Sequence, residues 1–293
     1  MGHFKTKNMT WQEYEKFVFE QIKDSFPNAV CEFNSKVFGK YSRGERQCDV
    51  LVTQNIAGEK IKILVDAKYY SKKIDVKAVE DFISMCNDVD VSEGILVTPK
   101  GYSELAYNRA ENDPSQIILD ILSLEDLHHL QGYMAIPYSG EFGCLIQPAF
   151  GWIIDANQWF GNLAWSYRKG FDFNRAYKEK EFSYFNIWNT IEDPLTSKEL
   201  FEQQVELLAE TSTVIENTIE TFNEGDKVLT TRKTIIENYL APEYACAVEY
   251  DGFIFFGVLV SENNRETVNF KKLIKVIGQS LPINIDYAPH NTV

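Results

Sequence analysis

Two carboxylates and one lysine early in the chain are the residue types of a metal-dependent hydrolytic site. They are Asp49, Asp66 and Lys68. Carboxylates held side by side repel each other unless a cation lies between them, and their hard oxygen atoms favour Mg²⁺ or Mn²⁺ over zinc. Such a metal stabilises charge on a phosphodiester oxygen and lowers the pKa of bound water, while a lysine orients or deprotonates that water. The combination indicates phosphodiester hydrolysis.

A predicted β-hairpin brings these three residues together. Two apolar stretches rich in β-branched residues flank Ala57-Gly58-Glu59, which has the character of a turn. A turn centred between the first two residues of this segment places Asp49 directly opposite Asp66. Because side chains alternate along a strand, Asp66 and Lys68 are expected to share one face of the sheet. The two predicted strands span residues 48–53 and 61–68.

A third carboxylate, Glu15, lies on a predicted amphipathic helix. Apolar residues recur at helical spacing from Trp11 to Phe26, and Thr10 in front of them is a suitable N-cap. Glu15 falls on the apolar side of this helix, where a charge is costly without a partner. Two interpretations stay open: Glu15 completes or supports the metal site, or it lies at the edge of the apolar stripe. The residues expected to face inward are Trp11, Tyr14, Phe17, Val18 and Ile22.

Beyond the hairpin, predicted helices alternate with predicted strands. Helical spacing and buried apolar runs follow one another up to about residue 121. This order predicts an α/β fold, a mixed sheet flanked by helices, in which a hairpin comes early and crossover connections come later. The further predicted elements are a strand at 29–33, a polar loop at 39–44, helices at 76–87 and 103–110, and strands at 94–98 and 116–121.

The spacing of these residues resembles a known nuclease motif. Asp49, sixteen intervening residues and then Asp66-Ala67-Lys68 resemble the PD-(D/E)xK pattern. Cys48 stands where that pattern has its proline, which is its loosest position. The order of elements, with Tyr14-Glu15 on the first helix and Gly94 opening a buried strand, is similar to the Mrr-like restriction endonucleases from residue 11 to about residue 130.

The resemblance implies a restriction-endonuclease-like fold and a role for each site residue. It implies Asp49 and Asp66 as metal ligands, a further ligand from the backbone carbonyl of Ala67, and Lys68 as the catalytic lysine. Glu15 corresponds to the helix carboxylate, a further catalytic residue and candidate metal ligand. The implied cofactor is Mg²⁺ or Mn²⁺, and the implied substrate is DNA.

Two groups of cations in the same region are candidates for contacts with nucleic acid. Arg43 and Arg46 lie in and after the polar loop, and Lys72 and Lys73 follow the second strand of the hairpin. Phosphate contact and solvated surface charge are both open interpretations for them. The net charge of −14 argues against broad coating of nucleic acid, because affinity for phosphates comes mainly from Lys and Arg. Any such contact is expected to be local.

The character of the chain changes after Gly132, where glycine, aromatic and turn residues become frequent. We therefore expect a nuclease-like domain at residues 1–133 and an α+β domain at residues 134–293, which supplies recognition, regulation or dimerisation. The second domain is expected to contain a hairpin around Asp251-Gly252 and a closing helix at 268–277.

The clearest pattern in the second part is a heptad-like stripe over residues 197–222. Its apolar positions alternate spacings of four and three, which predicts one long helix. This helix either packs within its own domain or pairs with the same helix of a second copy, and a homodimer would suit cleavage of both DNA strands. The stripe consists of Phe201, Val205, Leu208, Ser212, Ile215, Ile219 and Phe222.

Two function classes are compatible with these patterns. The first is a metal-dependent endonuclease that hydrolyses DNA, of restriction or phage-defence type. The second is a non-catalytic module that keeps the nuclease fold and binds nucleic acid or protein. No stretch reaches the roughly 18 apolar residues of a membrane span, and the five cysteines show no CxxC spacing, which favours the cytoplasm and no membrane partner.

Overall fold

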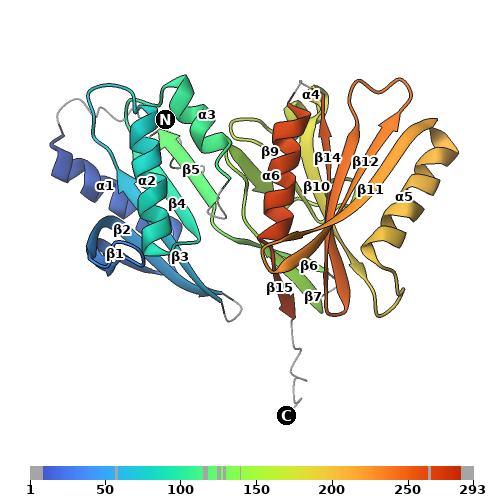
Figure 1. Cartoon of the computed structure of the whole chain (residues 1–293), viewed down its shortest axis with the longest axis horizontal. Coiled ribbons are helices and arrows are strands. Elements are labelled where there is room, and N and C mark those ends of the chain that lie inside the picture. The colour runs from blue at the N-terminus through green and yellow to red at the C-terminus, as the bar shows by residue number, and fades with distance from the viewer. Residues whose placement is uncertain are drawn as a thin grey trace, which may run out of the picture. The chain divides into compact units, whose positions relative to one another are not determined.

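The computed structural model describes residues 9–56, 59–114, 118–123, 127, 130–138, 140–262 and 265–284. The chain divides into two compact units, Met1–Leu130 and Gln131–Val293 (Figure 1). Among the described residues, no helix is both long enough and apolar enough to cross a membrane.

The first unit is built on a five-stranded mixed sheet whose strands lie in chain order. β1, β2 and β3 pair antiparallel, whereas β3, β4 and β5 pair parallel. β4 is buried along its whole length because it lies between two strands and beneath a helix. The expected mixed sheet flanked by helices is thus confirmed. The strands are β1 (Val30–Phe38), β2 (Glu45–Ile56), β3 (Glu59–Ala67), β4 (Glu93–Thr98) and β5 (Ile118–Ser123).

The hairpin of β2 and β3 has the register expected from its sequence. The pairing runs without interruption from Ile56 opposite Glu59 to Val50 opposite Val65. The next positions in this register are Asp49 and Asp66, which therefore lie opposite each other at the end of the ladder. The turn itself, at residues 57 and 58, lies outside the described residues.

Three helices pack on this sheet, and each begins at a side chain that caps it. In α1 (Trp11–Ser25), the Thr10 hydroxyl accepts from the N–H of Glu13, whose carboxylate accepts from the N–H of Thr10. Asp75 and Ser103 cap α2 (Val76–Val89) and α3 (Glu104–Glu111). Tyr14, Val18 and Ile22 are buried as expected, but Trp11 is 56% exposed. The inward orientation predicted for Trp11 is wrong, because the buried stripe of the helix begins one turn later.

The second unit is an α+β structure with two antiparallel sheets. The larger sheet has seven strands in the order β11-β12-β13-β14-β10-β9-β8, and the smaller has the order β15-β7-β6. Its strands are β6 (Met134–Tyr138), β7 (Phe142–Ile146), β8 (Trp152–Asp155), β9 (Ala164–Arg168), β10 (Glu181–Asn189), β11 (Val214–Glu224), β12 (Lys227–Ile236), β13 (Glu243–Tyr250), β14 (Phe253–Ser261) and β15 (Leu281–Asn284).

Two helices cover opposite faces of the seven-stranded sheet (Figure 1). Alternation along β13 shows how: Cys246 and Val248 belong to the core with α6 (Glu266–Gly278), whereas Ala245 and Ala247 belong to the core with α5 (Ser197–Thr211). The expected hairpin is present, because Tyr250 pairs with Phe253. A third, short helix is α4 (Phe173–Glu179).

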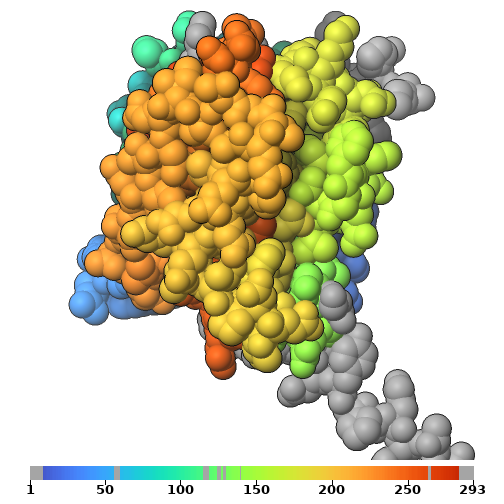
Figure 2. All heavy atoms as spheres, turned by 90° about the vertical axis from the view of Figure 1, so that its right-hand side faces the viewer, coloured from blue at the N-terminus to red at the C-terminus, as the bar shows by residue number. Residues whose placement is uncertain are grey.

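The long helix expected over residues 197–222 is wrong in its second half. α5 ends at Thr211, and residues 214–224 form β11, which pairs along its length with β12. β-branched residues are frequent in this segment and favour a strand. A spacing of four also places Ile215 and Ile219 on one face of a strand, so the stripe did not distinguish the two structures. Figure 2 looks onto α5 and the neighbouring strands. A homodimer through a helix 197–222 is ruled out because that helix does not form, whereas a homodimer through another surface of the second unit stays a prediction.

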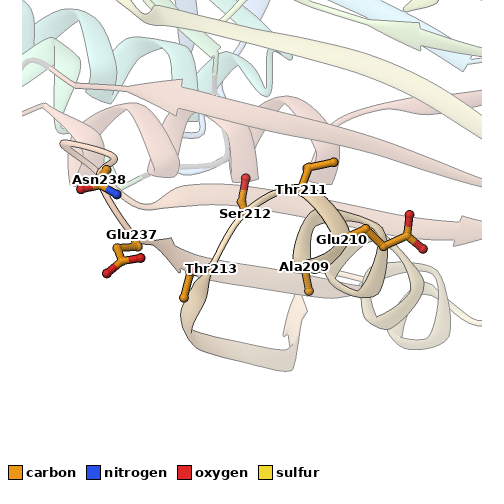
Figure 3. Close-up of a pocket in the computed structure, with 7 residues that line it drawn as sticks. All are labelled: Ala209, Glu210, Thr211, Ser212, Thr213, Glu237 and Asn238. Atoms are coloured by element: carbon orange, nitrogen blue, oxygen red, sulfur yellow. The ribbon is translucent and has the colours of Figure 1, made fainter.

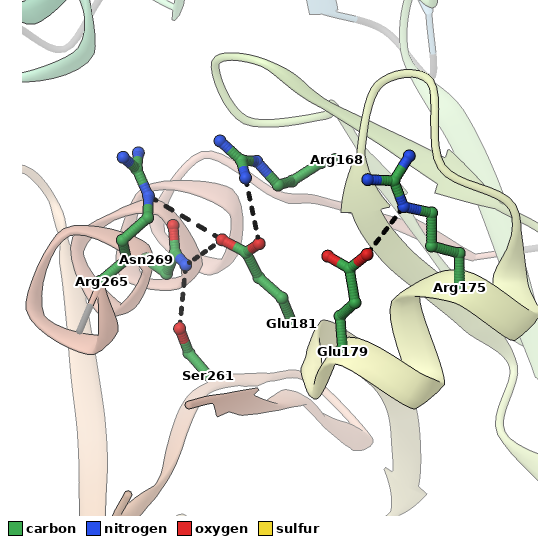
Figure 4. Close-up of polar contacts among 7 residues, drawn as sticks. All are labelled: Arg168, Arg175, Glu179, Glu181, Ser261, Arg265 and Asn269. Carbon is green, nitrogen blue, oxygen red and sulfur yellow. Dashed lines mark hydrogen bonds and ion pairs between the residues drawn. The ribbon is translucent and has the colours of Figure 1, made fainter. Parts of the chain in front are cut away.

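A buried carboxylate joins three elements of the second unit (Figure 4). Glu181, at the start of β10, is fully buried. It accepts a hydrogen bond of 3.0 Å from Asn269 of α6 and one of 3.3 Å from Arg168 of β9. Arg265 approaches it to 3.8 Å, and Asn269 also donates to Ser261 of β14. The network compensates the burial of this charge.

Candidate active site

The two aspartates meet at the open end of the β2–β3 hairpin. Asp49 is half-buried, and Asp66 is only 7% exposed. The Ala67 N–H donates to Asp49 Oδ2 at 2.9 Å, so the aspartate side chain takes a donor at the point where the strand ladder ends. The two carboxyl groups also share a hydrogen bond. A hydrogen bond between carboxyl groups needs a proton, so this arrangement favours the protonated form of Asp49.

The electrostatics of this pair follow from its burial. Burial raises the pKa of Asp49, and the hydrogen bond and negative charge of Asp66 raise it further, to about 7. The N–H of Ala67 opposes this rise, because it stabilises the ionised carboxylate. A positive charge bound between the two aspartates would therefore stabilise their ionised forms.

Lys68 supplies one positive charge beside the aspartates. Its backbone N–H donates to the carbonyl of Val97 at 2.8 Å, which extends the pairing of β3 with β4 by one residue. Its Nζ lies 2.8 Å from Asp66 Oδ2, and one third of the side chain is exposed. Burial lowers the pKa of Lys68, but Asp66 and then Asp49 outweigh this effect and the pKa is raised. The lysine is therefore a cation at neutral pH.

Glu15 lies close enough to influence this group, but it does not join a ligand cluster. It is half-buried on α1, and its pKa is raised by burial and by the charge of Asp66, with Lys68 opposing. Within the described part of the chain, no three His, Cys, Asp or Glu side chains approach closely enough to hold one metal ion. Glu15 thus approaches the aspartates from α1, and its role as a ligand stays a prediction.

The structure adds one residue that the sequence analysis missed. Phe33 pairs with Val50 and Ser35 with Cys48, which places Asn34 of β1 opposite Asp49. Asn34 has a left-handed backbone with φ of 52° and accepts a hydrogen bond of 2.5 Å from the Gln47 side chain. Asparagine tolerates this conformation better than most residues, and its presence within a strand was the available signal.

The predicted cations around the site differ in their surroundings. Arg43 is exposed on the loop between β1 and β2 and has a left-handed backbone with φ of 54°. Arg46 is half-buried and lies 3.6 Å from Asp88, so its charge is partly neutralised. Lys72 and Lys73 are exposed shortly after β3. Their contact with nucleic acid stays a prediction.

The donor set fits a hard divalent metal. Two carboxylates face each other, and Mg²⁺ is commonly held by one or two carboxylates and otherwise keeps its water ligands. Cys48 is the nearest soft donor, but burial and then the charges of Asp49 and Asp66 raise its pKa to about 11, which leaves it a neutral thiol. Asp49 and Asp66, with the carbonyl of Ala67, are the groups that could hold Mg²⁺ or Mn²⁺.

An open polar pocket lies elsewhere, at the end of α5 in the second unit (Figure 3). Its volume is about 440 Å³, and it includes none of the predicted catalytic residues. Its two ionisable side chains are both acidic and no aromatic ring lines it, so it lacks the cations and rings that favour binding of nucleic acid. The lining residues are Ala209, Glu210, Thr211, Ser212, Thr213, Glu237 and Asn238.

Comparison with solved structures finds distant, partial likenesses. A protein of unknown function, AF1548, is 16% identical, with 43% of this chain and 70% of that one covered and a TM-score of 0.33. The PsbP protein of the cyanobacterium Synechocystis sp. PCC 6803 is 14% identical, with 52% and 93% covered and a TM-score of 0.35. The DNA modification-dependent restriction endonuclease AspBHI is 16% identical, with 43% and 38% covered and a TM-score of 0.26. Likenesses this distant do not indicate a function.

Comparison of sequences is more specific for the first unit. No curated protein matches the chain. The Mrr_cat family model, described as a restriction endonuclease, matches residues 6–130. This range contains the mixed sheet, its three helices and the group formed by Asp49, Asp66 and Lys68. Residues 6–130 are therefore identified as a restriction endonuclease domain of the Mrr_cat family.

Proposed function

We propose that the first unit is a Mg²⁺-dependent endonuclease that hydrolyses phosphodiester bonds in DNA, of restriction or phage-defence type and acting in the cytoplasm. The observation that carries this proposal is the facing pair of Asp49 and Asp66 with Lys68 in direct contact, 2.8 Å from Asp66. Its position in a restriction endonuclease domain supports the assignment. A purely structural ion pair would not need a second, opposed carboxylate.

Asp49 and Asp66, with the carbonyl of Ala67, would hold the metal. When bound, Mg²⁺ stabilises negative charge on a phosphodiester oxygen and lowers the pKa of a bound water. The N–H of Ala67 fixes the orientation of Asp49 through their 2.9 Å hydrogen bond. Asp66 fixes the ammonium group of Lys68, which orients the attacking water. To deprotonate that water, Lys68 must first give up its own proton. Glu15 adds a further negative charge from α1, which would strengthen the attraction of this group for a metal cation.

The proposed DNA contacts lie on both sides of the hairpin. Lys72 and Lys73 follow β3 by a few residues and are exposed, which suits contact with phosphates flanking the scissile bond. Arg43 extends from the loop before β2. Arg46 contributes less free charge because Asp88 is its partner, so we propose that it mainly holds this loop.

Cleavage of supercoiled plasmid with Mg²⁺ tests the proposal. Wild-type protein is expected to produce nicked or linear product, and Lys68→Ala is expected to lose about 100-fold or more of this activity, as is typical for loss of a general acid or base. Lys60→Ala is the matched control, because Lys60 is an exposed lysine of the same strand, remote from its catalytic end. It should retain wild-type activity.

The outcome also separates the enzyme from a non-catalytic binding module. Equal behaviour of wild type and Lys68→Ala on double-stranded DNA, single-stranded DNA and RNA contradicts the proposed catalysis. Calorimetric titration with Mn²⁺ gives an independent measure, since Asp49→Ala and Asp66→Ala should each abolish the binding that wild type shows. Absence of Mn²⁺ binding to wild type favours the binding module.

A further inference from the structure

We infer that an aromatic and basic surface of the second unit binds single-stranded DNA by stacking on its unpaired bases. This surface, called here the stacking surface, consists of Trp159, Phe160, Tyr177, Lys178 and Lys180, around the short helix η3 (Trp159–Gly161) and α4. The inference rests on the proposed function in taking DNA as the substrate, and it assigns nucleic-acid recognition to a unit that lies outside the restriction endonuclease domain.

Three rings of this surface remain exposed although a complete core lies beneath them. Trp159 is 42%, Phe160 73% and Tyr177 41% exposed. The core beneath includes Trp165 and Phe182, which are only 3% and 5% exposed. Burial of apolar area therefore does not explain why the outer rings are aromatic. Clustered exposed aromatic rings are typical of binding surfaces.

Phe160 is held outward by an unfavourable backbone. Its φ of 54° and ψ of 29° lie in the left-handed region, which costs a residue with a Cβ atom roughly 1–2 kcal/mol. The ring lies 5.5 Å from the Tyr177 ring and 5.9 Å from the Phe173 ring, between centroids. Such conformations persist only where the surrounding structure holds them, and they are frequent at binding and active sites.

Trp159 is oriented in advance of any ligand. Its ring stacks on Phe173 with 4.9 Å between centroids and 17° between planes. Its Nε1 donates to Asp155 at 3.2 Å, and the Nε1 of Trp165 donates to its carbonyl oxygen at 3.0 Å. One face of the indole is thus covered by Phe173, and its plane is fixed. Fixing a ring in advance lowers the entropic cost of stacking a base on it.

The charge beside these rings comes from lysines rather than arginines. Figure 4 shows that both nearby arginines have carboxylate partners, with Arg175 2.8 Å from Glu179 and Arg168 3.3 Å from Glu181. Lys178 and Lys180 form no ion pair with any residue that the structure describes.

Lys180 lies directly over one of the exposed rings. Its Nζ is 4.7 Å from the centroid of Tyr177, and Lys178 is the exposed neighbour of that tyrosine on α4. Unpaired ammonium groups beside exposed rings match the alternation of phosphates and bases in a single strand. In a duplex both faces of each base are covered by neighbouring bases, so the rings have no partner there. The surface therefore fits a single-stranded segment or a nucleotide flipped out of a duplex.

Fluorescence anisotropy with a labelled oligonucleotide of about 12 nucleotides tests the inference, since single-strand sites span about 4–16 nucleotides. The full chain is used in EDTA, where metal-dependent cleavage does not occur. Phe160→Asn is expected to weaken binding about tenfold, because stacking on one ring contributes about that much. Asparagine tolerates the left-handed backbone, so this variant should fold, and Phe160→Tyr should bind as wild type does.

Charge and position are tested in the same assay. The double variant Lys178→Ala/Lys180→Ala should lower the slope of log affinity against log salt by about 1.4, the value for two phosphate contacts on a single strand. Tyr239→Ala and Lys271→Ala are matched controls, because these exposed residues of the second unit lie outside the stacking surface. Both should bind as wild type does.

Several results would overturn the inference. The first is equal affinity of Phe160→Asn and Tyr239→Ala for the single strand. The second is a matched duplex that binds as tightly as the single strand. The third is polyglutamate that binds as tightly as the oligonucleotide, a result that would indicate an acidic protein partner. The two proposals fail separately. If Phe160→Asn loses single-strand binding but wild type does not cleave plasmid, the stacking surface is supported and the proposed nuclease activity is contradicted. If wild type cleaves plasmid but Phe160→Asn binds single strands normally, only the stacking surface is contradicted.

Discussion

The facing positions of Asp49 and Asp66 suit the proposed metal site but lower the stability of the sheet. Like charges directly opposite on a sheet destabilise the pairing of its strands. Here the cost is reduced by the raised pKa of Asp49, which favours its protonated form, and by the N–H of Ala67, which donates to Asp49. A metal ion would replace that proton with a larger positive charge. The site is therefore expected to be more stable with metal than without it.

Asp49→Asn separates these two effects. The asparagine side chain can accept from the N–H of Ala67 and donate to Asp66, so it reproduces both hydrogen bonds without the charge. In EDTA, the variant is expected to be at least as stable as wild type, by about 0–1 kcal/mol in urea unfolding. Its affinity for Mn²⁺ should fall at least tenfold by calorimetry. A variant clearly less stable than wild type in EDTA would show that the carboxylate pair is not repulsive.

At the scale of elements, α2 lies directly on β4 because one strand position lacks a side chain. A Cβ atom added to Gly94 would lie 2.5 Å from the sulfur of Cys86 and 3.0 Å from the ring of Phe82. Gly94 and Leu96 share the sheet face of Asp66, in the register of β3 with β4. This close contact helps to hold the strand beside the catalytic one.

Gly94→Ala is expected to destabilise the first unit by about 1–3 kcal/mol, the usual cost of overpacking a core. Cys86→Ala removes the sulfur atom that the new methyl group would meet. The double variant should therefore be less destabilised than the sum of the two single variants, and a double-mutant cycle in urea measures the difference. Strict additivity of the two changes would contradict direct packing of α2 on β4.

The capping box of Thr10 and Glu13 begins α1, the helix that contains Glu15. Thr10→Ala removes the hydroxyl that accepts from the N–H of Glu13 and half of the capping box. We expect a loss of about 1 kcal/mol in urea unfolding, typical of a lost N-cap. Ser25→Ala at the other end of the helix is the control, since its exposed hydroxyl only donates to a carbonyl within the helix. Equal losses of unfolding free energy in the two variants would show that the Thr10 cap does not stabilise α1.

At the scale of the whole molecule, the chain combines a nuclease fold with a separate compact unit of different architecture. The chain is strongly acidic, with a net charge of −14, so nucleic-acid binding depends on local groups of cations. The proposed contacts accordingly lie around the β2–β3 hairpin in one unit and around α4 in the other. That the units act as separate domains divided near residue 133, one of which recognises or regulates, stays a prediction.

Glu181→Ala tests whether the second unit can be destabilised without loss of the first. The change leaves Arg168 and Arg265 without their buried partner, and about 3 kcal/mol of stability should be lost. Glu179→Ala removes a more exposed ion pair with Arg175 and should cost about 0.5 kcal/mol at most. Calorimetry should show a lower unfolding temperature only for the second unit in Glu181→Ala. Equal shifts for both units would show that they unfold together.

The sequence by itself determined the local arrangement of the catalytic group. β-branched residues define both strands of the hairpin, and the strands pair in the register that places Asp49 opposite Asp66. The capping residue Thr10 likewise determined where α1 begins. These features depend on residues close together in the chain, which is why patterns of spacing predict them.

Only the tertiary structure decided features that depend on distant partners. Residues 214–224 form a strand because β12 supplies its hydrogen bonds, although their spacing also fits a helix. Asn34 faces Asp49 through the pairing of β1 with β2, and Arg46 is partly neutralised by Asp88 of α2. The exposure of Phe160 is set by rings from other segments that fill the core beneath it. Such contacts join residues far apart in sequence, so the local spacing of residues does not predict them.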